Sequence, residues 1–194
     1  YFPELCSADE EIASGELPEG AEGWFAIPRW EKLAPTYGEA VERVFVAIAS
    51  KRAFYNYRQG QLGPQYLREH ERTVAMLKKL GEAQSGYDIL VVPAQFGMRH
   101  RGRSVRLARE VMTPNEFGLG AYEVGIMLLT HPERLVSYDD LWVDCPGDEY
   151  APDADGRSGV ASDFDFSGDG VEFGTRWVDY AVGGDGSASA FLPQ

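Results

Sequence analysis

YDILVVPAQFGMRHRGRSVRLAR, residues 87–109, is the stretch that decides the fold. It opens with an apolar run rich in β-branched residues at positions 89–92, is interrupted at Gly97, and then carries five arginines and one histidine. The apolar run predicts a buried strand, and the residues after it predict a turn and a helix that begins near Ser104. In α/β folds, the carboxyl end of a strand is where a site is commonly presented.

The first half of the chain shows mainly helical periodicity. Apolar residues at i, i+3 and i+4 spacing predict an amphipathic helix from about Thr36 to Ser50. A second helix is predicted from Pro64 to about Gln84, with Leu67 among its core-facing residues. The stretch from Leu119 to Thr130 is apolar all round, which predicts a helix buried on several sides.

The last third is poorer in helical periodicity and richer in strand signals. Residues 141–143 predict a short strand, and DFDFSGDGVEF at 163–173 predicts a hairpin, because Asp-Gly supplies the positive φ that such turns need. Residues 177–180 predict a further strand. The end of the chain, from 183 onward, is expected to be a loop until Phe191 and Leu192 dock on the core.

Together these signals predict an α+β (or α/β) fold in a single domain. It has a helical N-terminal half, a central buried strand and a β-richer acidic C-terminal third. Residues 1–23 are expected to form an irregular arm with one short helical turn at 8–14, and residues 24–194 the globular domain. A length of 194 residues with 44% hydrophobic residues is sufficient for a substantial core.

The formal net charge of −13 is spread unevenly. Residues 136–194 hold 13 acidic and 2 basic residues, which places −11 of the total there. Such a chain repels a phosphate backbone, so non-specific nucleic-acid binding is not expected. No apolar run reaches the roughly 18 residues of a membrane span, and no signal peptide is recognisable after Tyr1. We therefore expect a cytoplasmic protein, although a leader removed before Tyr1 would leave the same sequence.

The arginine-rich segment is the main candidate site. Guanidinium groups bind phosphate or carboxylate in a bidentate manner, and a nearby helix N-terminus adds backbone N–H donors. The candidate ligand-binding residues are Arg99, Arg101, Arg103 and Arg106. Three of them, at 99, 103 and 106, would share a helical face if the helix began early. Alternatively, these arginines pair with carboxylates of the acidic last third.

Two functions of different classes are compatible with this pattern. The leading hypothesis is a non-catalytic binding protein whose arginine-rich turn recognises an anionic small molecule or an acidic protein partner. The alternative is a small α/β enzyme acting on a phosphorylated or nucleotide-like substrate, with the arginines holding phosphate and His100 as acid or base. No cofactor motif is present, and we expect no cofactor.

Metal and thiol chemistry receive little support from the sequence. Asp153 and Asp155 resemble part of a calcium loop, but the full EF-hand spacing fails, which favours a solvated acidic loop over residues 144–155. Cys6 and Cys145 are expected to be separate thiols, although one disulfide between them remains an alternative. As a nucleophile, Cys145 is disfavoured because the proline that follows lacks the N–H of an oxyanion hole.

Three segments carry a resemblance to a known group of proteins. They are PAQFGMRHRGRSVRLAREVMTPNEFGLGAYEVGIMLLTHPERL (93–135), LWVDCPGDEY (141–150) and GSASAFLPQ (186–194). Together they resemble an uncharacterised protein family of candidate-phylum bacteria with small genomes. The resemblance covers most of the chain from Trp24 onward and implies no activity, cofactor or catalytic residue.

Overall fold

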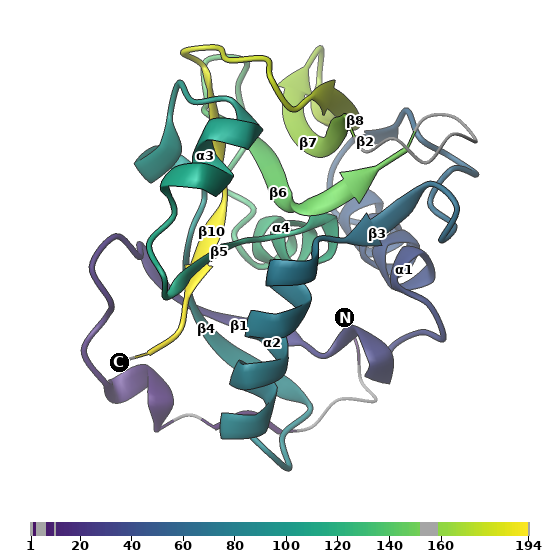
Figure 1. Ribbon diagram of the computed structural model, residues 1–194. Helices are drawn as coiled ribbons and strands as arrows, with labels where there is room; N and C mark the ends of the chain where they lie inside the picture. The colour runs from purple at the N-terminus through teal and green to yellow at the C-terminus, as the bar shows by residue number, and fades with distance from the viewer. Residues whose placement is uncertain (1, 3–6, 10, 152–158, 194) are drawn as a thin grey trace.

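In the computed structural model, which describes residues 2, 7–9, 11–151 and 159–193, the apolar run at 89–92 lies in strand β4. This strand is flanked on both sides in a four-stranded sheet of order β1-β4-β10-β5 (Figure 1). The strands are β1 (Gly23–Pro28), β4 (Ile89–Gln95), β10 (Ser189–Phe191) and β5 (Glu116–Gly118). The predicted central buried strand is therefore confirmed.

A second sheet is built mainly from the last third of the chain. Its order is β2-β8-β7-β6-β3, with β9 paired to β6. The strands are β2 (Phe54–Asn56), β3 (Leu67–Glu69), β6 (Trp142–Tyr150), β7 (Val160–Ser167), β8 (Gly170–Trp177) and β9 (Asp185–Ser187). The hairpin predicted at 163–173 is confirmed, and Gly168 takes the positive φ of +62° at its turn.

Four α-helices accompany the sheets in the described part of the chain: α1 (Tyr37–Ala49), α2 (Glu71–Ala83), α3 (Val105–Val111) and α4 (Ala121–Thr130). Short 3-10 turns form at Ile12–Ser14 (η1), Trp30–Lys32 (η2) and Met98–His100 (η3). Thr36 caps α1 by accepting a hydrogen bond from the backbone N–H of Glu39 at 3.3 Å. The fold is α+β, as expected from the sequence.

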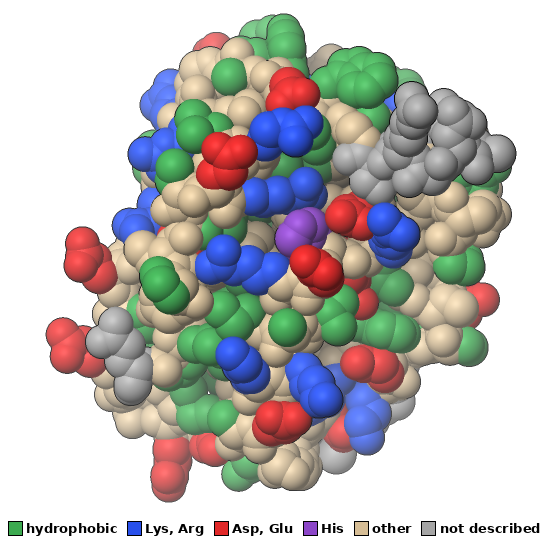
Figure 2. Space-filling model, in the orientation of Figure 1, with side chains coloured by type: hydrophobic (Ala, Val, Ile, Leu, Met, Phe, Trp, Pro, Cys, Tyr) green, Lys and Arg blue, Asp and Glu red, His purple; other side chains and the backbone are tan. Residues whose placement is uncertain are grey.

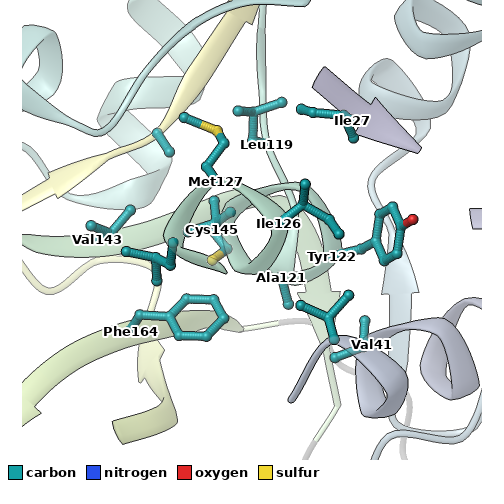
Figure 3. Close-up of a cluster of buried hydrophobic side chains, with 14 of the residues drawn as sticks. Ile27, Val41, Leu119, Ala121, Tyr122, Ile126, Met127, Val143, Cys145 and Phe164 are labelled. Carbon is teal, nitrogen blue, oxygen red and sulfur yellow. The ribbon is translucent and has the colours of Figure 1, made fainter. Parts of the chain in front are cut away.

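Helix α4 is the centre of the hydrophobic core, as its composition predicts. Its residues from Ala121 to Leu129 are all buried, and side chains of α1, β1 and both sheets surround it (Figure 3). Gly125 lets α1 approach closely, because a Cβ at this position would lie 2.8 Å from a methyl group of Val44. Each large apolar side chain buried here contributes about 1.5–3 kcal/mol.

The predicted helix from Pro64 to Gln84 is wrong over its first seven residues, 64–70. Leu67 lies in β3, where it pairs with Tyr150 of β6, and α2 begins only at Glu71. His70 caps α2 through its Nδ1, which accepts from the backbone N–H of Arg72 at 3.2 Å. The strand forms because of a partner 83 residues away in the chain, which local periodicity does not encode.

Strand β6 is longer than the predicted strand at 141–143, and this corrects the interpretation of the acidic segment. Asp144 and Asp148 lie inside β6 and are 3% and 0% exposed, so neither belongs to a solvated loop. The strand continues through the pair Pro146 and Gly147 with an irregular register against β7. Asp153 and Asp155, the weak metal candidates, lie outside the described residues.

The two ends of the chain differ in part from expectation. The strand predicted at 177–180 is wrong, since β8 ends at Trp177 and a turn follows. The segment from 183, expected to be a loop, supplies β9 and β10, which join the two sheets. In the arm, the described residues show η1 and an isolated bridge between Ala8 and Ile89. Among the described residues, no helix has the length and apolar character that crossing a membrane requires.

Candidate functional site

The arginine-rich turn follows β4 directly. The side-chain oxygen of Gln95 accepts hydrogen bonds from the backbone N–H groups of Gly97 (2.6 Å) and Arg99 (3.3 Å), and so shapes the turn. Gly97 has a φ of +122°, and a Cβ there would lie 2.5 Å from the carbonyl oxygen of Gly186 in β9. Only glycine allows this approach. The conformation of the turn is thus determined by contacts with β4, which precedes it, and with β9, which packs against it.

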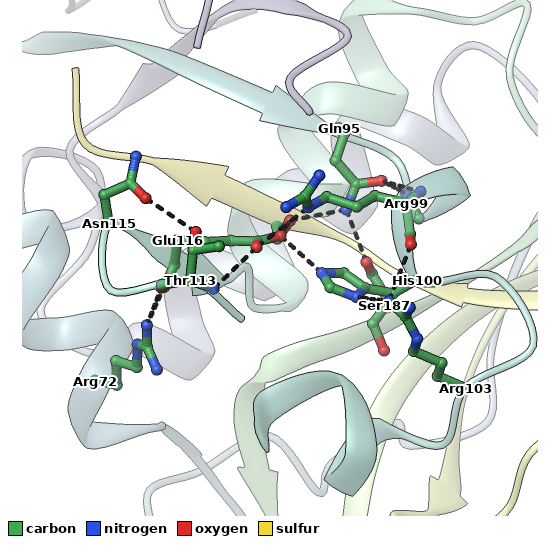
Figure 4. Close-up of polar contacts among 11 residues, drawn as sticks. Arg72, Gln95, Arg99, His100, Arg103, Thr113, Asn115, Glu116 and Ser187 are labelled. Carbon is green, nitrogen blue, oxygen red and sulfur yellow. Dashed lines mark hydrogen bonds and ion pairs between the residues drawn. The ribbon is translucent and has the colours of Figure 1, made fainter. Parts of the chain in front are cut away.

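The centre of the turn is a buried hydrogen-bond network around Glu116 (Figure 4). Oε1 of Glu116 lies 2.7 Å from His100 Nε2 and 2.6 Å from the hydroxyl of Ser189, and Oε2 lies 3.3 Å from Arg99 Nε. Glu116 is 0% exposed. Burial alone would raise its pKa, but the hydrogen bonds from His100 and Ser189 outweigh burial and lower the pKa to about 2. Glu116 is therefore a buried carboxylate with well-placed donors.

His100 is held by both of its ring nitrogens. Arg103 Nη1 lies 2.9 Å from Nδ1, and because a guanidinium only donates, Nδ1 must accept. The ring proton is then on Nε2, which donates to Glu116. His100 is 1% exposed. This geometry favours a structural role for the residue over that of an acid or base with access to substrate.

The four candidate ligand-binding arginines do not converge on one point. Arg99 and Arg103 contact the buried network, whereas Arg101 donates from Nε to the carbonyl oxygen of Gly183 at 2.8 Å. Arg106 forms a two-pronged ion pair with Asp179 on the surface. Basic and acidic side chains alternate on the face that carries α2 and α3 (Figure 2). The pairing of Arg106 agrees with the alternative interpretation that arginines meet carboxylates of the last third.

The expected shared helical face of residues 99, 103 and 106 is wrong. Helix α3 begins at Val105, with Ser104 as its N-cap, so the first two arginines precede it. The Ser104 hydroxyl accepts a hydrogen bond from the backbone N–H of Leu107 and so caps α3. Cys145, which the sequence disfavours as a nucleophile, is a free thiol buried in the core (Figure 3). Burial raises the pKa of this thiol well above its usual range.

A cavity of about 450 Å³ lies between α2 and the segment from Ile27 to Glu31. Its walls are largely apolar and include the side chains of Ile27, Trp30, Val74, Leu77 and Leu90. Four acidic residues also line it, namely Glu31, Glu69, Glu82 and Glu123. Sequence reasoning missed this site, because its acids come from four separate elements. One signal was present: Glu123 is the single charged residue in the apolar stretch 119–130.

Glu123, which lines the cavity, and Asp148, which lies next to it, gather around the N-terminus of α4. The backbone N–H of Gly120 donates to Glu123 Oε2 at 3.0 Å, and that of Ala121 donates to Asp148 Oδ2 at 2.8 Å. Tyr37 donates its hydroxyl to Asp148 Oδ1 at 2.7 Å. A Cβ on Gly120 would lie 2.3 Å from both that carboxylate oxygen and the Tyr37 hydroxyl, so these groups close tightly around Gly120.

Like charges and burial change the protonation of these acids. Burial, followed by the charges of Asp148 and Glu31, raises the pKa of Glu69 to about 7. Burial and then Glu69 raise the pKa of Glu123 well above its ordinary value. Burial also raises the pKa of Asp148 to about 6, although Tyr37 donates to it. At neutral pH the three carboxyl groups are therefore not all ionised in the folded protein.

The two basic residues that line the cavity neutralise little of the negative charge of these acids. Arg29 donates from Nε to the carbonyl of Tyr87 (2.8 Å) and from Nη2 to those of Gly81 (2.8 Å) and Gln84 (3.0 Å). It thereby caps the C-terminus of α2. Lys78 is the other basic residue of the lining, and it forms no ion pair within the described part of the chain. Glu69 likewise has no ion-pair partner among the described residues.

A second group of buried acids surrounds Arg176 in the other sheet. Arg176 forms ion pairs with Asp163 (3.1 Å), Asp165 (3.8 Å) and Asp185. Asp144 lies beside them, and burial followed by the charges of Asp163 and Asp185 raises its pKa to about 8. Among the described residues, no group of three or more His, Cys, Asp or Glu side chains is arranged to hold a metal ion.

Comparison of the chain with protein-family models, with curated proteins and with solved structures found no match. The chemistry of a ligand therefore has to be inferred from the side chains themselves. Of the two places described, the arginine-rich turn is closed by its own hydrogen bonds, whereas the cavity beside α2 is open and holds an acid without an ion-pair partner.

Proposed function

We propose that the protein binds a small organic ligand in the cavity between α2 and the segment from Ile27 to Glu31. One observation carries the proposal: two carboxyl groups with a raised pKa, those of Glu69 and Glu123, line a cavity that also has a wall of apolar side chains. Its volume is within the range of about 300–1,000 Å³ that ligand pockets occupy. An apolar pocket with a few convergent polar groups and perturbed pKa values is the usual form of a ligand site.

The structural needs of the fold explain only part of this acid group. Asp148 and Glu123 accept hydrogen bonds from the backbone N–H groups at the start of α4, which have no partner within the helix, so both residues stabilise the fold. Glu69 has no such task, because it lies on the short edge strand β3 and caps no helix. Glu69 accepts a hydrogen bond from the Trp30 side chain but has no ion-pair partner among the described residues. The cost of holding it near like charges is therefore only partly offset, which supports a role in binding.

The cavity can be tested by filling it. Val74 lines the cavity on α2 and is 46% exposed, so Val74→Trp is expected to fold and to occupy the space. Val111 on α3 is 44% exposed and lies outside the cavity lining, so Val111→Trp is the matched control. A fragment library is screened by thermal shift, in which a ligand of the folded state raises the melting temperature.

We expect fragments that stabilise the unmodified protein and Val111→Trp but do not stabilise Val74→Trp. Equal shifts in Val74→Trp would place binding elsewhere and overturn the proposal. An absence of any stabilising fragment in the unmodified protein would also count against it.

An anionic ligand or acidic partner at the arginine-rich turn, and a His100-dependent enzyme, stay predictions with less support. Arg99 and Arg103 are engaged with the Glu116 network, and His100 has no free ring nitrogen. Arg101 is exposed and donates through Nε to the carbonyl oxygen of Gly183.

A further inference from the structure

We infer that the ligand of the cavity carries a protonated amino group joined to an apolar or aromatic part. This inference rests on the proposed function and specifies the chemical class of the ligand. The amino group would lie against Glu69 and Glu123, and the apolar part would lie between Trp30 and the α2 residues Val74 and Leu77.

The charges of the lining select a cation. Four glutamates line the cavity against two basic residues, and Arg29 already donates to three backbone carbonyls. An anionic ligand would meet like charges in a partly desolvated space, which is costly. A neutral ligand would gain hydrogen bonds but would leave the repulsion between Glu69, Glu123 and Asp148 in place. A cation converts that repulsion into attraction.

The geometry at the floor of the cavity limits where the cation can lie. Glu123 Oε2 and Asp148 Oδ1 both face Gly120, and Asp148 is closed off by hydrogen bonds from Tyr37, Ala121 and Ser162. Asp148 therefore does not contact a ligand in the cavity and would attract a bound cation only through its negative charge. Glu69 and Glu123 are the two acids of this group that line the cavity. Glu69 is half-buried whereas Glu123 is 1% exposed, so an ammonium group would contact Glu69 directly, with Glu123 close behind it.

Trp30 provides the remaining part of the site. Its ring packs edge-to-face on Tyr37 with a centroid distance of 6.0 Å, which fixes its orientation. Its side chain also forms a hydrogen bond that lowers the pKa of Glu69, although burial and the nearby charges dominate. An indole face attracts cations and packs well on apolar groups. An alkyl amine that carries an aromatic ring, and is therefore protonated at neutral pH, satisfies both the acids and this wall.

Binding of a cation must release a proton from Glu69. The charged and titratable groups that interact with Glu69 lie on several elements: Asp148 of β6, Glu31 of η2, Glu123 of α4 and Tyr37 of α1. Trp30 of η2 forms a hydrogen bond with Glu69. The other charged residues that line the cavity are Lys78 and Glu82 of α2 and Arg29, which caps α2. A cation favours the ionised carboxylate, whereas protons compete with the cation below pH 7. For one group with a pKa of about 7, the affinity is expected to rise about tenfold from pH 6 to pH 8.

Three isosteric probes test the inference by calorimetry: benzylamine, benzyl alcohol and benzoate. They are measured on the unmodified protein, on Glu69→Gln, and on the control Glu110→Gln, which removes an exposed acid on α3 outside the cavity lining. Circular dichroism and thermal melting confirm that each variant is folded. We expect benzylamine to bind at least ten times more tightly than benzyl alcohol, benzoate to be rejected, and the preference for the amine to disappear in Glu69→Gln alone.

The outcomes separate the inference from the proposed function. If benzyl alcohol binds as well as benzylamine and Val74→Trp abolishes both, the cavity is a ligand site but the inference of a cation is overturned. If the amine binds equally to Glu69→Gln, or if its affinity does not rise between pH 6 and pH 8, the inference is also overturned. If none of the probes binds and no library fragment does, the proposed function itself fails.

Discussion

Substitution of Asp144 by asparagine is expected to stabilise the protein at neutral pH. Asp144 is 3% exposed in β6, beside Asp163 and Asp185, and its pKa is raised to about 8. The folded protein therefore holds a proton at this position at pH 7, whereas the unfolded chain, with an aspartate pKa of about 3.9, has released it. Asparagine is nearly isosteric with the protonated acid and needs no proton to fold.

The size of the effect follows from proton linkage. Because the pKa of Asp144 is raised on folding, its contribution to stability is fully present below the unfolded pKa of about 3.9 and is lost as the pH rises towards about 8. The loss is about 1.4 kcal/mol for each pH unit in this window. Between pH 3.9 and pH 7 it reaches about 4 kcal/mol as an upper value. We expect Asp144→Asn to gain about 2–4 kcal/mol at pH 7 and less than about 1 kcal/mol at pH 4.5.

The assay is urea denaturation of both proteins at pH 4.5, 6, 7 and 8, with the free energy of unfolding taken by linear extrapolation. Asp139→Asn, at an exposed turn position, is the control and should show little difference at any pH. A difference between Asp144→Asn and the unmodified protein that is constant with pH would refute the reasoning. A loss of stability at pH 7 would show that Asp144 is ionised in the folded protein.

Two further substitutions test the buried polar contacts. His100→Ala removes the Nε2 donor of the buried Glu116 carboxylate, which keeps Arg99 and Ser189 as partners. We expect a loss of about 1–3 kcal/mol in urea denaturation, and a loss below about 0.5 kcal/mol would contradict the network. Gly120→Ala places a Cβ 2.3 Å from Asp148 Oδ1 and the Tyr37 hydroxyl, so we expect a loss of about 1–3 kcal/mol and a lower melting temperature, and an unchanged melting temperature would contradict this close packing.

The elements that the sequence predicts well are those with a local cause. Helix α1 has a capping threonine and one apolar face, and α4 has an apolar stretch with a single charged residue. The hairpin at 163–173 has glycines at its turn, although the positive φ is taken by Gly168 and not by the predicted Asp-Gly pair. Strand β4 and the turn after it follow from the apolar run and Gly97. Each of these signals acts within a few residues, so it can be recognised without knowledge of the partner.

The elements that the sequence does not reveal depend on distant partners. Strands β3, β9 and β10 have three residues each, too few for a clear periodic pattern, and they form because β6 and β4 offer free edges. The cavity is harder to predict, because Glu69 and Glu123 are brought together only when β3 pairs with β6, against which α4 packs. A glutamate inside an apolar helix was the one local sign of a buried acid group.

The acidity of the last third takes on a different meaning once the structure is considered. The formal charge of −13 assumes that every carboxyl group is ionised at pH 7. Yet Asp144 and Asp148 lie on one buried strand, and the pKa values of both are raised, to about 8 and about 6. At pH 7 Asp144 is protonated, and a neutral carboxyl group costs far less to bury than a charged one. Asp148 is largely ionised at that pH and is stabilised by hydrogen bonds from Tyr37, Ala121 and Ser162. The folded protein is therefore less negative than its sequence implies. The same burial that raises these pKa values leaves Glu69 ready to exchange its proton for a cation.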